Sequence, residues 1–311
     1  MTKRLVSIGL SLILAAVWIA GCANLGQIQD QQNGQPIAEK QQRNNQMKIT
    51  QQDTAKKIDD KQQTMSIQGK VKAHGNIKAL AGGSEAENRV LKPMSNYLLQ
   101  KKYPNIVVMR GAANRNRVAL TFDDGPDAKF TPQVLDVLHK HGVKGTFFLM
   151  GSRVKGHPGV TKRIHREGHV IGNHTYWHPK LYQESIDRLK WEASETDKAI
   201  QSVAGYSPKL FRAPYGGLNE EIVRTLGQMN FSVVGWTVDS MDWTQADSAT
   251  VQKNIRSNLH PGAVILLHSG GHWTQDLSGM VKAIDELIPT LKKEGVEFVT
   301  VPQLLNLPGK K

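Results

Sequence analysis

Strand-like and helix-like segments alternate from Arg117 to the C-terminal end, and this alternation limits the possible folds more than any other feature. The first strand-like segment, 118–123, has the two-residue period of an extended chain packed on at least one face. Strands alternating with helices form a parallel sheet covered by helices. Seven such units predict an α/β fold, a distorted (β/α)7 barrel that lacks one unit of the eightfold form. The other strands are expected at 145–150, 169–172, 209–212, 231–238, 263–268 and 297–301.

Two of the expected helices have defined start signals. The helix at 133–141 follows Pro132, with Thr131 as its cap. The helix at 220–229 has Asn219 as its cap and acidic residues in its first turn, which complement the helix dipole. Longer helices are expected at 183–203 and 277–293.

Residues 1–22 have the form of a secretory signal. Lys3 and Arg4 precede an apolar run, 5–20, and small residues then lead to Cys22, the one cysteine of the chain. The Ile-Ala-Gly-Cys ending resembles the bacterial lipobox, which implies cleavage before Cys22 and a lipid on its sulfur. A signal peptide cut elsewhere and an uncleaved anchor are the alternatives. In each case we expect the rest of the chain to be extracytoplasmic, and a lipid would anchor it to the cell membrane.

The segment 23–87 is rich in Gln, Asn and Lys and contains no aromatic residue. Such a composition cannot bury enough apolar surface to offset the chain entropy lost on folding, so we predict a disordered polar linker. A coil of about 60 residues has a root-mean-square span of roughly 40–45 Å. The linker would therefore hold a domain at 88–311 away from a membrane.

The chain carries 40 Lys and Arg against 27 Asp and Glu, a formal charge of +13. This excess favours anionic surroundings such as phospholipid headgroups or an acidic cell wall. Nucleic acid is not an expected partner, because basic residues do not cluster with interleaved aromatic residues. No obligate protein partner is indicated.

Polar residues of catalytic type follow several of the strands, at the carboxyl edge where the active sites of such barrels lie. Asp123 and Asp124 end the first strand, and two adjacent carboxylates there repel each other unless a cation shares them. His174 and His178 follow the third strand, and on a helical turn their spacing would direct both imidazoles to one metal ion. One carboxylate and two imidazoles would leave positions open for water and substrate, as in a catalytic site. The later strands end at Arg212, at Asp242 and Trp243, and at His268.

Each pattern also has an ordinary structural explanation. An Asp-Asp-Gly-Pro segment is commonly a surface turn. A histidine pair at this spacing is often two surface residues, and a histidine after an apolar strand is often a core residue with satisfied hydrogen bonds. The catalytic interpretation depends on finding such residues at five strand ends of one barrel.

The five segments resemble, in order, the five motifs of the polysaccharide deacetylases, also called carbohydrate esterase family 4 or the NodB-homology domain. The segments are T-F-D-D-G-P-D, H-T-Y-W-H, R-A-P-Y-G, D-S-M-D-W and L-L-H, and the resemblance covers about residues 115–308. It implies a hydrolase of C–N bonds other than peptide bonds, which removes N-acetyl groups with the help of one divalent metal ion. Zn²⁺ is the metal expected first, with Co, Ni or Mn as alternatives.

The resemblance also implies roles for the residues of the first three motifs. Asp124, His174 and His178 would bind the metal ion. Asp123 would be the general base that takes a proton from the attacking water. Arg212 would orient Asp123 through charge-assisted hydrogen bonds.

The remaining roles that the resemblance implies concern the oxyanion, the leaving amine and the acetyl group. The backbone N–H of Tyr215 would stabilise the oxyanion. His268 would protonate the leaving amine, with Asp242 keeping its imidazole charged. Trp243 and Leu266 would form the walls of the acetyl pocket.

Peptidoglycan is the substrate that an extracytoplasmic location favours. Chitin-like oligomers and an exopolysaccharide are alternatives, and O-acetyl xylan is a weaker one. The alternative to an enzyme is a wall lipoprotein whose barrel binds glycan without hydrolysing it. The sequence departs from many relatives at Ser269, where an acidic residue often follows the last-motif histidine, and this affects the tuning of His268.

Overall fold

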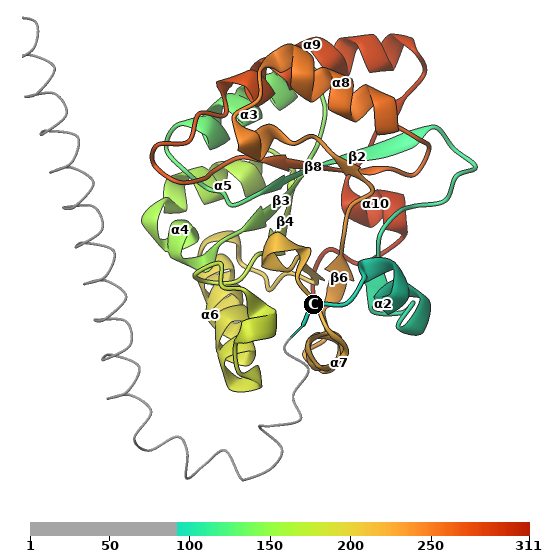
Figure 1. Cartoon of the computed structure of the whole chain (residues 1–311). Helices are drawn as coiled ribbons and strands as arrows, with labels where there is room; N and C mark the ends of the chain where they lie inside the picture. Colours follow the sequence, from blue (N-terminus) through green and yellow to red (C-terminus); the bar gives the residue numbers. More distant parts are fainter. Residues whose placement is uncertain (1–91) are drawn as a thin grey trace, which may run out of the picture. The chain divides into compact units, whose positions relative to one another are not determined.

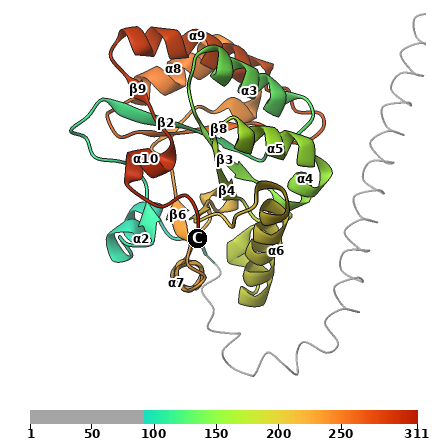
Figure 2. The same cartoon turned by 180° about the vertical axis from the view of Figure 1, so that it is seen from behind.

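The structure, a computed structural model, describes residues 92–311 (Figures 1 and 2). The predicted signal segment with Cys22 and the predicted linker lie outside the described residues. Within 92–311, no helix combines the length and apolar character needed to cross a bilayer.

Parallel pairing joins all the strands of the described part of the chain into one sheet, which follows the order β1-β6-β5-β4-β3-β2-β8-β7, with β9 beside β2. The chain passes directly from β6, which pairs with β5, to β7, which pairs with β8. One continuous stretch therefore closes the ring, and the predicted distorted barrel of parallel strands is confirmed. The strands are β1 (Val107–Val108), β2 (Arg117–Asp123), β3 (Thr146–Leu149), β4 (Val170–Asn173), β5 (Leu210–Phe211), β6 (Ser232–Val234), β7 (Val238–Asp239), β8 (Val264–His268) and β9 (Glu297–Phe298).

Helices surround the strands on the outside of the barrel. In Figures 1 and 2, α3, α8 and α9 lie together on one side of the strands and α4, α5 and α6 lie on another. Apolar side chains fill the layer between the strands and these helices, among them Phe122 and Phe147, which stack with ring centroids 4.9 Å apart. A second apolar cluster, which includes Ala119, Phe148 and Val264, lies on the other face of the strands. The helices are α2 (Asn96–Lys102), α3 (Phe130–Lys140), α4 (Gly151–Gly156), α5 (Pro158–Arg166), α6 (Ile186–Ala204), α7 (Glu220–Gln228), α8 (Ser248–Asn258), α9 (Ser278–Lys293) and α10 (Val301–Leu305).

The expected strand at 231–238 is wrong as a single element, because it divides into β6 and β7. The carbonyls of Val234 and Gly235 accept hydrogen bonds from the Arg212 side chain at 3.2 and 3.0 Å. Both carbonyls therefore bind the buried guanidinium of Arg212, and the strand is interrupted at this point.

The expected strand at 297–301 is also too long. It ends at Phe298, and Thr300 instead begins α10 with a capping box that it shares with Gln303. The Pro at the first turn of α10 is the signal that marks a helix start here.

The start of α3 differs from the prediction, which placed the cap at Thr131. The Asp127 carboxylate accepts from the backbone N–H groups of Lys129, Phe130 and Thr131 at 3.1, 2.7 and 2.8 Å, so α3 begins at Phe130. The cap predicted for α7 is confirmed, since the Asn219 side chain accepts from a backbone N–H of the first turn.

Candidate active site and metal centre

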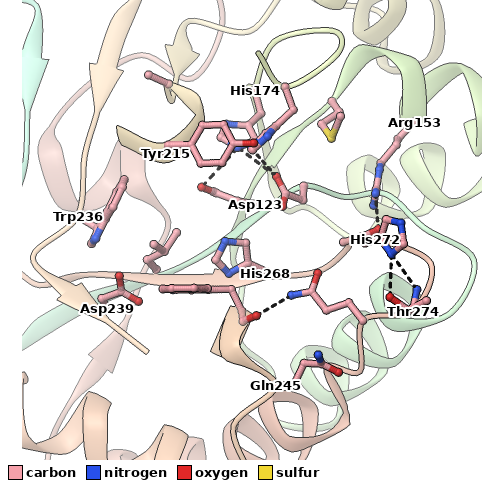
Figure 3. A pocket seen from close by; sticks show the side chains of 18 residues that line it. Asp123, Arg153, His174, Tyr215, Trp236, Asp239, Gln245, His268, His272 and Thr274 are labelled. Carbon is pink, nitrogen blue, oxygen red and sulfur yellow. Dashed lines mark hydrogen bonds and ion pairs between the residues drawn. The ribbon is translucent and has the colours of Figure 1, made fainter. Parts of the chain in front are cut away.

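A cavity of about 710 Å³ opens at the carboxyl ends of the strands (Figure 3). Residues from every predicted motif line it or contact its lining residues. Its walls include Asp123, Asp124, Met150, Arg153, His174, His178, Tyr215, Trp236, Asp239, Trp243, Gln245, Leu266, His268, His272, Thr274 and Gln275.

Asp123 is held at the end of β2 by a buried arginine. Its Oδ1 accepts from Nη1 of Arg212 at 2.9 Å, and the same nitrogen donates to the Thr121 hydroxyl at 2.7 Å. Asp123 is 4% exposed and Arg212 is 1% exposed, so this ion pair is withdrawn from water. A pair of this kind fixes the carboxylate in one orientation, as the resemblance implied for Arg212.

Asp124 lies beside both motif histidines. Its Oδ1 is 3.2 Å from Nε2 of His174 and 3.2 Å from Nε2 of His178, and the three ligand atoms lie within 4.8 Å of one another. Burial alone would raise the pKa of Asp124, but the two imidazoles hold it well below its usual range. The carboxylate is therefore ionised and available as a metal ligand.

These three residues fit a divalent cation. Oδ1 of Asp124 is buried without a hydrogen-bond partner among the described residues, which leaves an acceptor to be satisfied. Nδ1 of His174 lies 2.8 Å from the carbonyl of Arg212, which only accepts, so Nδ1 carries a proton and Nε2 is the nitrogen that faces Asp124 and would bind the ion. Two imidazole nitrogens and one carboxylate oxygen are a donor set that suits Zn²⁺.

The segment between the two histidines is a loop, so the expectation of a helical turn is wrong. Thr175 and His178 have left-handed φ values of 64° and 61°, which a helix cannot contain. The backbone N–H groups of Tyr176 and Trp177 donate to one oxygen of Glu192 at 2.6 and 2.8 Å. Glu192 is fully buried on α6, so a carboxylate from a distant helix shapes the loop that carries the metal ligands.

His268 and Asp242 form a buried pair across the cavity from the metal ligands. Nδ1 of His268 lies 2.8 Å from one oxygen of Asp242, and the backbone N–H of His268 donates to the other at 2.7 Å. Burial disfavours the imidazolium, but the charge and hydrogen bond of Asp242, together with the charges of Asp124 and Asp123, outweigh this and raise the pKa of His268 to about 9. His268 is thus protonated at neutral pH and able to act as an acid.

The residues predicted for the oxyanion and the acetyl group also line the cavity. Tyr215 has a left-handed φ of 58°, is 63% exposed, and packs on the His178 ring at 4.6 Å. Trp243 is 48% exposed and Leu266 is buried, so the two present a partly open apolar wall. The catalytic roles of these residues stay predictions.

Several cavity residues have no counterpart in the sequence-based prediction. They belong to two connections, the one after β3 and the one after β8, together with a polar residue two positions after Trp243. The rule that active sites lie after the strands points to these connections, but their residue types form no motif. They are Arg153, Gln245, His272, Thr274 and Gln275.

Comparison with known proteins agrees with this geometry. The family profile described as polysaccharide deacetylase matches residues 110–234. A peptidoglycan-N-acetylglucosamine deacetylase of Bacillus cereus is 46% identical over 198 residues, which cover 63% of this chain and 70% of the relative. This chain belongs to the polysaccharide deacetylase family.

Other members of the family share the same part of the chain. A peptidoglycan-N-acetylglucosamine deacetylase of Listeria monocytogenes is 37% identical over 193 residues, and the chain spans 40% of that relative's length. A crystal structure of the Bc1960 peptidoglycan N-acetylglucosamine deacetylase matches with a TM-score of 0.66 and 42% identity. The match covers 70% of this chain and all of that structure, so the deacetylase barrel accounts for the fold described above.

Proposed function

We infer that this polysaccharide deacetylase hydrolyses N-acetyl groups of an N-acetylglucosamine-containing cell-wall polysaccharide, with peptidoglycan as its substrate. The observation that carries this inference is the pairing of Asp123 with His268 in register on the neighbouring strands β2 and β8, beside the Asp124, His174 and His178 cluster. A proton acceptor and a proton donor therefore lie at one cavity, next to a cation site. The named relatives deacetylate peptidoglycan sugars, which supports this substrate over the chitin-like and exopolysaccharide alternatives.

Amide hydrolysis needs both proton transfers. Asp123 takes a proton as the oxygen of water attacks the acetyl carbonyl, and Arg212 keeps its carboxylate aimed at the cavity. The C–N bond then breaks, and His268 gives its proton to the nitrogen, so that acetate and a free amine leave. A bound divalent ion, Zn²⁺ in our proposal, supplies Lewis acidity at the carbonyl and acidifies water.

The same cavity accounts for positioning the acetyl group. Trp243 and Leu266 offer an apolar surface for the methyl group, and the backbone N–H of Tyr215 would donate to the carbonyl oxygen as it gains charge. Removing one such donor typically costs about 10²–10³ in kcat.

A lipid anchor at Cys22 would place the enzyme on the outer side of the cell membrane, within reach of the wall. The lipobox-like Ile-Ala-Gly-Cys ending supports this, and the polar composition of 23–87 suits a spacer. Cys22→Ser should release the chain from the membrane fraction of the cells that make it. Equal membrane retention of Cys22→Ser and the natural chain would refute lipidation at this residue.

The activity is tested by incubating the purified full chain with isolated peptidoglycan and measuring released acetate together with new free amines. We expect equal amounts of both products, loss of both after chelation, and recovery on adding Zn²⁺. Asp123→Asn is the matched control, since it removes the base and leaves the three metal ligands. Binding of glycan without acetate release under any metal would instead support the glycan-binding lipoprotein.

A further inference from the structure

Arg153 places a guanidinium in the cavity wall without a carboxylate partner. It belongs to α4, which follows β3 at the carboxyl edge of the barrel. One of its terminal nitrogens donates to the carbonyl of Gly271 (Figure 3). In the described part of the chain, no hydrogen bond of its other side-chain nitrogens and no ion pair with Asp or Glu is found.

Other arginines of the barrel contrast with Arg153. Arg212 is buried against Asp123, and Arg163, Arg188 and Arg256 each pair with a carboxylate within 2.9 Å. A guanidinium carries five N–H donors in a fixed plane and matches a carboxylate with two parallel hydrogen bonds. Arg153 therefore offers most of its donors to whatever enters the cavity.

The cavity has two unlike sides. In Figure 3, Arg153 and the loop with His272 and Thr274 lie on one side, Trp236 and Asp239 lie on the other, and His268 lies between them. His272 and Thr274 are joined to each other at 2.8 Å, so they form a polar edge beside the guanidinium. A ligand with a negative group would be oriented with that group toward Arg153 and away from Asp239.

We propose that Arg153 binds a carboxylate on the sugar next to the one that is deacetylated, and thereby selects an anionic N-acetylated glycan over a neutral one. The carboxylate belongs to the lactyl substituent of a muramic sugar or to the peptide attached to it. This rests on the proposed deacetylase function, and it assigns Arg153 a specificity role rather than a part in the chemical step.

The charge of the ligand matters because neutral hydroxyl groups would engage Arg153 less strongly. Hydrogen bonds between ionised partners are roughly twice as strong as those between neutral groups. The formal charge of +13 on the whole chain also favours an anionic polymer.

Two substitutions separate charge recognition from support of the neighbouring loop. Arg153→Gln removes the charge but keeps an amide that can donate to the Gly271 carbonyl. Lys155→Gln removes the same charge two residues away on α4, where the exposed ammonium lies 5.3 Å from the Tyr176 ring centroid and outside the cavity lining. Lys155→Gln therefore controls for long-range electrostatics.

The probes are alternating tetrasaccharides of N-acetylglucosamine and N-acetylmuramic acid in three forms: with free lactyl carboxylates, with these converted to amides, and with a dipeptide that carries its own carboxylates. The purified full chain should have a higher kcat/KM on a carboxylated form than on the amide form. Arg153→Gln should reduce that ratio by about 10- to 100-fold, while Lys155→Gln should leave it within about two-fold. The carboxylated probe on which Arg153→Gln lowers this kcat/KM ratio shows whether Arg153 binds the lactyl carboxylate or a carboxylate of the peptide.

Binding of the same probes is measured in the Asp123→Asn background, with and without Arg153→Gln. Charge-dependent binding that is lost with Arg153→Gln supports the proposal even if no acetate is released, an outcome that would overturn only the proposed hydrolysis. An unchanged ratio in Arg153→Gln, or an equal loss on all three probes, overturns the proposal. Equal loss would mean that Arg153 acts only as a support for the loop at Gly271.

Discussion

Replacing Asp242 by Asn should move the alkaline limit of activity, because Asp242 is what keeps His268 protonated. Asn has the same shape, and its carbonyl can still accept from the backbone N–H of His268. The pKa of His268 stands at about 9 against an ordinary value of 6.5, despite burial that lowers it. This difference corresponds to about 3 kcal/mol in favour of the imidazolium.

The sign of the effect follows from the direction of the shift. A raised pKa keeps the proton on His268 until the pH rises through about 9, and loss of Asp242, the largest cause of the rise, should bring that limit down toward 6.5. If the pKa of His268 fell the whole way to 6.5, the protonated fraction at pH 8 would fall from about 90% to about 3%, so kcat should drop by up to about 30-fold. At pH 5.5 protonation alone should cost little activity.

The assay is acetate release from a soluble N-acetylglucosamine oligomer between pH 5 and 10, at saturating substrate and Zn²⁺. Asp239→Asn is the control, since it removes a carboxylate of the cavity wall that has no hydrogen bond with His268 and is not among the groups that raise the pKa of His268, so it should leave the alkaline limit in place. If Asp242→Asn lowers kcat equally at every pH, His268 is not the acid that sets this limit.

Three further predictions concern the base and the metal loop. Asp123→Asn should keep metal affinity but lower kcat by about 10²–10⁴. Loss of metal affinity in this variant would instead show that Asp123 is the metal ligand and Asp124 the base. Metal should raise the Tm of the chelated natural chain but not that of His178→Ala, and an equal rise in both, seen by calorimetry, would place the ion elsewhere. Glu192→Gln should weaken metal binding about 10- to 100-fold in a competition titration, because Glu192 holds the loop between the ligands. Glu195→Gln on the same helix is its control, and equal affinities of the two variants would contradict this role.

The sequence alone could predict the barrel and the residues at its strand ends. Alternating segments identify the parallel strands, and Asp123 and His268 then fall at one edge because neighbouring parallel strands end together. Their hydrogen-bonded neighbours are harder to predict, since the interruption between β6 and β7 depends on Arg212 from another strand.

The conformation of the metal loop could not be read from local spacing. His174 and His178 are four residues apart, yet the loop is shaped by Glu192 on α6 and by hydrogen bonds that Gly151 and Ser152 donate to its carbonyls. These contacts join separate segments and leave no periodic pattern in the sequence.

The part of the cavity wall formed by the connections after β3 and β8 was missed for a related reason. Arg153 and His272 lie in connections outside the five motifs, and only the folded barrel brings them to one side of the cavity. The roles of these side chains follow from the hydrogen-bond and ion-pair partners that they have or lack in the folded chain, and not from the residues beside them in the sequence.

The most direct test of this account is anomalous diffraction at the zinc absorption edge from crystals of the full chain grown with Zn²⁺. We predict one strong anomalous peak within bonding distance of Asp124, His174 and His178, and no such peak after Asp124→Ala. A peak bound by other residues, or a crystal without a peak at this cluster, would contradict the metal centre on which the proposed deacetylase depends.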